Sequence, residues 1–104
     1  YLEFVGSFPC CVSGKANNVD VHHEALVRRF SGDRKRKFDF GAVPLDHEIH
    51  IEDRHRIGKT LFWSRHGVDP YDVALEILQS YMDTVPDDYE LAEEAMELIK
   101  DARR

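Results

Sequence analysis

The sequence predicts a small α+β fold, with a short β-hairpin, a helix packed across it and two helices at the C-terminal end. At 104 residues, with 42% hydrophobic and 33% charged residues, the chain has the size and composition of one globular domain. Apolar and polar residues alternate over Val19–His23, which is typical of a strand. After residue 69 the apolar residues recur at helical spacing instead. We expect a single domain over residues 1–104, with a core at about 8–68 and a helical part at 69–104.

The N-terminal half predicts short elements separated by turns. Residues 1–9 are apolar and aromatic and end at a proline, so we expect a short helix or strand there. Residues 10–18 contain Ser-Gly and Asn-Asn pairs, which favour a turn before the strand at Val19–His23. Residues 31–37 are expected to form a loop, and residues 38–45 (FDFGAVPL) a second strand or extended segment.

Three helices are expected in the remainder of the chain. The first covers His47–Phe62, although Gly58 is unfavourable inside a helix. The second begins at Asp69, whose carboxylate can cap a helix that has Pro70 in its first position. Pro86 ends this helix and the following aspartates can cap the third. The predicted inward-facing residues are Ile49, Ile57 and Leu61 in the first helix, Tyr71, Ala74, Leu75, Leu78 and Met82 in the second, and Leu91, Ala95, Leu98 and Ala102 in the third.

Charge is divided unevenly along the chain. The net charge is -6, yet residues 1–68 carry 11 basic and 9 acidic residues, whereas residues 69–104 carry 3 and 11. The basic residues of the first part can bind a polyanion, mainly through the phosphate backbone of DNA, while the acidic part stays away from it. The alternative is that these charges form an ordinary solvated surface. The candidate DNA contacts are Arg28, Arg29, Arg34, Lys35, Arg36, Lys37, Arg54, Arg56 and Lys59.

Cysteine usage and hydropathy predict a reducing setting away from the membrane. The two cysteines, Cys10 and Cys11, are adjacent and cannot form a disulfide framework. The longest apolar run is too short to cross a bilayer. We therefore expect a cytoplasmic protein with no membrane partner.

Histidines are abundant, at six in the chain, and five of them fall into two groups. His22 and His23 end the predicted strand, and His47, His50 and His55 lie on or near the first long helix. Neutral imidazoles bind transition metals, and an imidazole near its pKa can deprotonate water. Because neighbouring strand residues point to opposite faces, His22 and His23 cannot have the same task. With the nearby cations, the set indicates a single-metal phosphodiesterase. For His47, an ordinary surface or core position is the preferred interpretation.

Several short motifs follow one another in a specific order. They are Pro9–Gly14 (PCCVSG), His22-His23, Lys37–Asp39 (KFD), Val43–His50 (VPLDHEIH), His55–Gly58 (HRIG), Leu61–Trp63 (LFW) and Gly67–Pro70 (GVDP). Over residues 8 to about 80, their order and spacing resemble the HNH (His-Me finger) endonuclease superfamily, in its phage- and prophage-associated branch. That branch includes the phage nuclease that acts with a recombinase filament. The resemblance implies a ββα-metal core and a metal-dependent DNA endonuclease or nickase of low sequence specificity, in a bacterial or phage-infected cell.

The resemblance also implies roles for individual residues. His22 and His50 would bind one divalent metal ion (Mg²⁺, Mn²⁺, Ni²⁺ or Zn²⁺), and His55 would be a third ligand or a phosphate contact. His23 would be the general base, with Asp39 orienting it or shaping the site.

Zinc-bearing relatives carry a second, structural metal at four positions, from which this chain departs. Those positions read Cys10, Ser13, Asp46 and Ile49 here, and isoleucine cannot bind a metal. We therefore expect no structural zinc, with apolar packing around Ile49 in its place.

The spacing of the helix histidines is a second departure. His50 and His55 are five residues apart, whereas one α-helical face brings together residues three or four apart. Either the helix begins after His50, or His55 is not a metal ligand.

Two other functions remain open at this point. One is a catalytically inactive, HNH-derived module that binds DNA through the same scaffold and basic segment. The other is a protein-interaction domain whose working surface is the acidic C-terminal helices.

Overall fold

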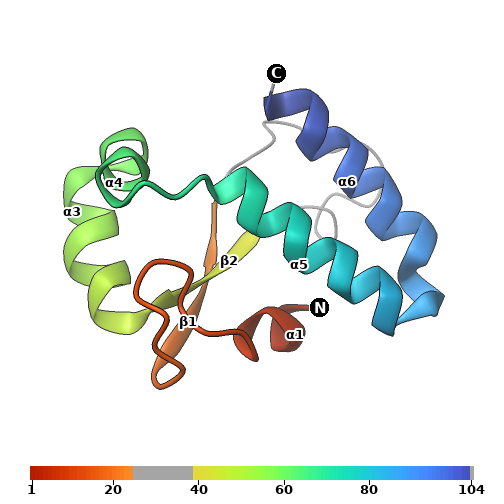
Figure 1. Cartoon of the computed structure of the whole chain (residues 1–104), viewed down its shortest axis with the longest axis horizontal. Coiled ribbons are helices and arrows are strands. Elements are labelled where there is room, and N and C mark those ends of the chain that lie inside the picture. The colour runs from red at the N-terminus through yellow and green to blue at the C-terminus, as the bar shows by residue number, and fades with distance from the viewer. Residues whose placement is uncertain (25–38, 104) are drawn as a thin grey trace.

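The structure, a computed structural model, describes residues 1–24 and 39–103, without the side chains of Lys59 and Pro86. Over these residues it is a small α+β arrangement of two antiparallel strands and several helices, as predicted (Figure 1). The elements in chain order are α1 (Leu2–Gly6), β1 (Val19–His23), β2 (Ala42–Asp46), the π-helix η1 (Ile49–Arg54), α3 (His55–Ile57), α4 (Lys59–His66), α5 (Pro70–Thr84), the 3₁₀ turn η2 (Pro86–Asp88) and α6 (Tyr89–Arg103).

The two strands form the centre of the structure. They pair antiparallel from Val19 opposite Asp46 to His23 opposite Ala42, and β1 has the bounds that its alternation predicts. The second strand is shorter than expected, since residues 39–41 form a turn before it begins. Every residue of β2 is buried, because α1 and α5 both pack against it.

Helix α5 begins as predicted at its N-cap. Asp69 Oδ1 accepts a hydrogen bond of 2.9 Å from the backbone N–H of Tyr71, and proline occupies the first helical position. Helix α6 runs back alongside α5, and both lie to one side of the hairpin (Figure 1). The predicted face of α5 is largely confirmed, with Ala74, Leu78 and Met82 buried, and Ile77 and Tyr81 extend it.

The predicted apolar face of α6 is correct only in part. Ala95 is fully buried as predicted, Leu91 is partly buried against the core, Leu98 is half-buried and Ala102 is exposed. The buried face is completed by Ala92, Met96 and Ile99. One step along an α-helix rotates the buried direction by about 100°, so two overlapping apolar patterns on one helix are easily confused.

The single helix expected over residues 47–62 is broken into three pieces. Gly58 has a φ of +84°, in the left-handed region, and interrupts the chain between α3 and α4. The break resets the direction in which side chains point, so Leu61 is 56% exposed although it was predicted to face inward. Phe62 and Trp63 are buried instead.

The core joins all of these elements. Its largest fully buried apolar side chains come from the segment before β2, from β2 and from α4, α5 and α6: Phe40, Leu45, Phe62, Leu78 and Ile99. Among the described residues, no helix is long and apolar enough to cross a membrane.

Three of the four positions at which the resemblance implied a structural zinc site accept backbone N–H groups here: Cys10, Ser13 and Asp46. Cys10 Sγ accepts the N–H groups of Val12 and Ser13, at 3.4 and 3.3 Å. Asp46 Oδ1 accepts the N–H groups of the two residues that lead into η1, at 3.0 and 3.4 Å. Ile49 packs against the core, as expected.

Candidate metal centre

The period of a β-strand brings three polar residues of one segment to the same side. Asp20 and His22 are two residues apart and share the face of β1 that is turned toward η1 and α3, and Glu24, one residue past the end of β1, continues the alternation on the same side. Their side chains contact residues of that helical segment, about 30 positions later in the chain. His23 points the other way and has a different partner, so the two neighbouring histidines do have different surroundings, as predicted.

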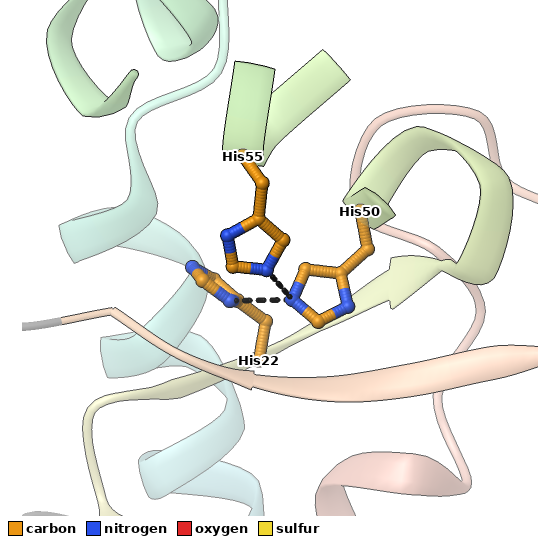
Figure 2. Close-up of side chains that lie close together, drawn as sticks. All are labelled: His22, His50 and His55. Atoms are coloured by element: carbon orange, nitrogen blue, oxygen red, sulfur yellow. Dashed lines mark hydrogen bonds between the residues drawn. The ribbon is translucent and has the colours of Figure 1, made fainter. Parts of the chain in front are cut away.

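Three histidines converge between β1 and the helical segment. His50 Nε2 lies 2.9 Å from His22 Nδ1 and 3.1 Å from His55 Nε2. Figure 2 shows the three rings turned toward one another from the strand and from the helices. His22 is buried, His50 is half-buried and His55 is exposed, so the cluster is closed on the strand side and open to solvent on the other.

The π-helix explains why His55 reaches the cluster. In an α-helix, five residues correspond to about 500°, which leaves the two side chains about 140° apart. In η1 the backbone N–H of His55 instead bonds to the carbonyl of His50, the i→i+5 hydrogen bond of a π-turn. Residues five apart then lie nearly above one another. The first alternative offered by the sequence is therefore wrong, because the helical segment includes His50. His55 lies close enough to His22 and His50 to serve as a ligand despite the five-residue spacing.

Two of the separations between the nitrogens fit a bound transition metal. Two imidazole nitrogens at about 2.0–2.1 Å from one zinc ion are about 2.9–3.4 Å apart at bond angles of 90–110°. The two distances at His50 Nε2 fall within this range, and the candidate ligand atoms of all three residues lie within 4.8 Å of one another. Three neutral imidazoles with an open side suit a divalent first-row metal with exchangeable positions for water or substrate. These three histidines are thus close enough to hold a metal ion.

A buried ion pair contacts His22 at Nε2, the ring nitrogen that does not face His50. Glu24, 1% exposed, accepts from Arg54 through both carboxylate oxygens, at 3.0 and 2.8 Å, and lies 2.7 Å from His22 Nε2. Burial alone would raise the pKa of Glu24, but the hydrogen bonds from His22 and Arg54 outweigh it and lower the pKa to about 2. Glu24 is therefore a carboxylate that can only accept hydrogen bonds.

A second carboxylate supports His50. Asp20 Oδ2 lies 2.9 Å from His50 Nδ1 and 2.7 Å from His47 Nδ1. The hydrogen bond with His50, followed by the one with His47, lowers the pKa of Asp20 below its ordinary value. His47, for which an ordinary surface position was preferred, is about half exposed and contacts the site through Asp20.

The predicted general base has the predicted carboxylate partner. His23 Nε2 lies 2.8 Å from Asp39 Oδ1, and about a third of each side chain is exposed. A carboxylate at Nε2 favours the tautomer that carries its proton there. The imidazole then presents the lone pair on Nδ1.

Arg54, a predicted DNA contact, pairs with a buried carboxylate in the structure. Its guanidinium forms the bidentate pair with Glu24, and its side chain is 15% exposed. The charge of Arg54 is therefore paired inside the protein. Arg56 is 73% exposed, with Asp53 4.0 Å away, and is accessible to a polyanion. The side chain of Lys59 is not described. The other predicted DNA contacts lie outside the described residues: Arg28, Arg29, Arg34, Lys35, Arg36 and Lys37.

Sequence reasoning missed Asp20 and Glu24. Their signal was nonetheless present, since a strand that reads Asp-x-His-x-Glu places both carboxylates on the face of the histidine between them. Metal-binding histidines commonly donate their second N–H to a carboxylate, so this alternation is itself a sign of such a site.

Comparison of the chain with protein-family models, with curated proteins and with solved structures finds no match.

Proposed function

We propose that the chain is a metal-dependent phosphodiester hydrolase, a DNA endonuclease or nickase of low sequence specificity built on a ββα-metal core. The observation that carries the proposal is the convergence of His22, His50 and His55 on one point, next in the chain to the His23–Asp39 pair. Metal ligands and an oriented imidazole are the two parts that water-mediated phosphodiester cleavage requires.

Each group has a task in the proposed reaction. A divalent ion held by His22, His50 and His55 would neutralise the scissile phosphate and the leaving 3′ oxygen. Asp39 holds the proton on His23 Nε2, so His23 Nδ1 accepts the proton of the water that attacks phosphorus in line. Because His22 and His23 lie on opposite faces of β1, the substrate would approach across the edge of the hairpin. The exposed position of His55 leaves that side open.

Charge distribution supports DNA as the substrate. The first 68 residues, which contain every group named above, have a net charge of +2, while the remainder has -8. Exposed cations near the cluster, such as Arg56, can contact phosphates without reading bases, which gives binding with little sequence preference.

A nicking assay on supercoiled plasmid tests the proposal. The protein is incubated with Mg²⁺, Mn²⁺, Ni²⁺ or Zn²⁺, and His23→Ala is compared with His66→Gln, a matched change of a histidine outside the cluster. We expect nicking that a chelator stops, a loss of about 10²–10⁴ in rate for His23→Ala and little change for His66→Gln. Absence of nicking with all four ions, or full activity of His23→Ala, would overturn the proposal.

The inactive DNA-binding module is the second candidate, and the loss of ligands at the structural zinc positions favours it. It would bind plasmid without nicking it in any metal. Charge reversal at Lys35, Arg36 and Lys37 distinguishes both DNA-binding functions from the protein-interaction domain, because only DNA binding predicts weaker affinity and a shallower salt dependence.

A further inference from the structure

We propose that Asp20 and Glu24 are positioning residues of the metal centre, each holding the outer proton of one histidine so that the inner nitrogens present their lone pairs to a common point. The inference rests on the metal-binding part of the proposed function and is independent of hydrolysis. Neither carboxylate needs to touch the ion.

Glu24 selects the tautomer of His22. A neutral imidazole has one N–H donor and one lone pair, and its hydrogen bonds decide which nitrogen has which. His22 Nε2 lies 2.7 Å from Glu24 Oε2, and Glu24 is kept as a carboxylate by Arg54. The proton of His22 therefore sits on Nε2, and the lone pair is on Nδ1, the atom that faces His50.

Asp20 holds His50 in the opposite tautomer. Its Nδ1 lies 2.9 Å from Asp20 Oδ2, so its proton sits on Nδ1 and its lone pair is on Nε2. The two inner nitrogens, His22 Nδ1 and His50 Nε2, are 2.9 Å apart. Two lone pairs at this separation repel each other unless a cation or an added proton lies between them. Both carboxylates thus prepare the pair of rings for a cation.

Each carboxylate is in turn fixed by a second donor. Arg54 holds Glu24 through two hydrogen bonds, and His47 contacts the same oxygen of Asp20 that His50 does. The donors come from the helical side and the carboxylates from the strand side, so the contacts also fix the distance between the two ligand-bearing segments. Losing such outer contacts typically weakens metal affinity by about 10–100-fold.

Zinc titration against a chromophoric chelator provides the first test. Wild type is compared with Asp20→Asn and Glu24→Gln, and with the control Glu52→Gln, which removes the same charge from an exposed position in η1. We expect a loss of about 10–100-fold in affinity for the first two variants and less than about threefold for the control. Equal affinities in all four proteins would overturn the inference. Failure of wild type to bind any of Mg²⁺, Mn²⁺, Ni²⁺ and Zn²⁺ would instead overturn the proposed function.

Imidazole ¹⁵N NMR of the metal-free wild type provides a second test. It reports the tautomer of each ring, which carboxylates with a merely structural role would not set. At a pH at which the rings are neutral, we expect the Nε2–H tautomer for His22 and the Nδ1–H tautomer for His50. The reverse tautomer at either ring would overturn the inference, whether or not the metal binds. Asp20 is partly exposed, so Asp20→Asn should fold, and we expect a mixture of tautomers at His50. If Glu24→Gln does not fold, Asp20→Asn and the wild-type spectrum still decide the matter.

Discussion

Removing the guanidinium of Arg54 should destabilise the fold far more than removing any exposed cation. The side chain of Glu24 is completely buried, and Arg54 forms two of its hydrogen bonds. In Arg54→Met the Glu24 carboxylate would keep its hydrogen bond with His22 but lose the positive charge of Arg54. Breaking a buried pair by removing one partner typically costs about 3–5 kcal/mol. Since domains of this size are stable by about 5–15 kcal/mol, the expected loss is a large fraction of the total.

A double-mutant cycle isolates this effect. Urea unfolding is followed by circular dichroism in the presence of a chelator, because a bound metal would add its own stabilisation. We expect Glu24→Gln, which removes the buried charge, to restore much of the stability that Arg54→Met loses, giving a coupling energy of more than about 2 kcal/mol. Arg65→Met, at an exposed position, serves as the control and should change stability by less than about 0.5 kcal/mol.

The outcome also decides between two roles for Arg54. A loss below about 1 kcal/mol in Arg54→Met, with no coupling to Glu24, would mean that the pair contributes little in solution and that Arg54 is available to DNA.

Three further predictions follow from the structure. Deleting Glu52 should shorten the spacing of His50 and His55 from five residues to four. Zinc affinity should then stay within about tenfold of the wild-type value, because an α-helix also places residues four apart on one face. A larger loss, similar to that in His55→Ala, would contradict the role of the π-turn. In urea unfolding, Leu78→Ala should lower the free energy of unfolding by about 2–5 kcal/mol and Leu61→Ala by less than about 0.5 kcal/mol, since the first side chain is fully buried and the second is exposed. Equal losses of stability would contradict the observed break at residue 58. Burial raises the pKa of Cys11 to about 12. Iodoacetamide at about pH 8 should therefore label Cys11 at least tenfold more slowly in the native than in the unfolded protein, as measured by mass spectrometry. Equal labelling rates would show that the thiol is exposed.

Features set by local patterns were predictable from the sequence. Strand β1 has the bounds that its alternation indicates, and α5 begins at the Asp69-Pro70 pair. In both cases, neighbouring residues carry enough information to set the direction of the chain. The association of His22 with His50, 28 residues apart, was implied by the motif resemblance, and the structure brings these two residues together.

Features that depend on distant contacts were not predictable in this way. The sequence of η1 contains no residue that demands a π-turn, and the i→i+5 hydrogen bond at His55 became apparent only in the structure. The partner of Arg54 is 30 residues away in the chain, so the ion pair with Glu24 could not be inferred from the residues around Arg54. The face of α6 was predicted only in part because alanines and leucines there form two overlapping helical patterns, and packing against α5 selects one of them.

A crystal grown with Zn²⁺ or Ni²⁺, with anomalous data collected at the absorption edge of the metal, gives the most direct measurement of the metal centre. We predict one strong anomalous peak at about 2.0–2.1 Å from His22 Nδ1, His50 Nε2 and His55 Nε2. A protein that stays metal-free under these conditions, or a peak at other residues with the three rings left without an ion, would contradict the assignment of this cluster as a metal centre.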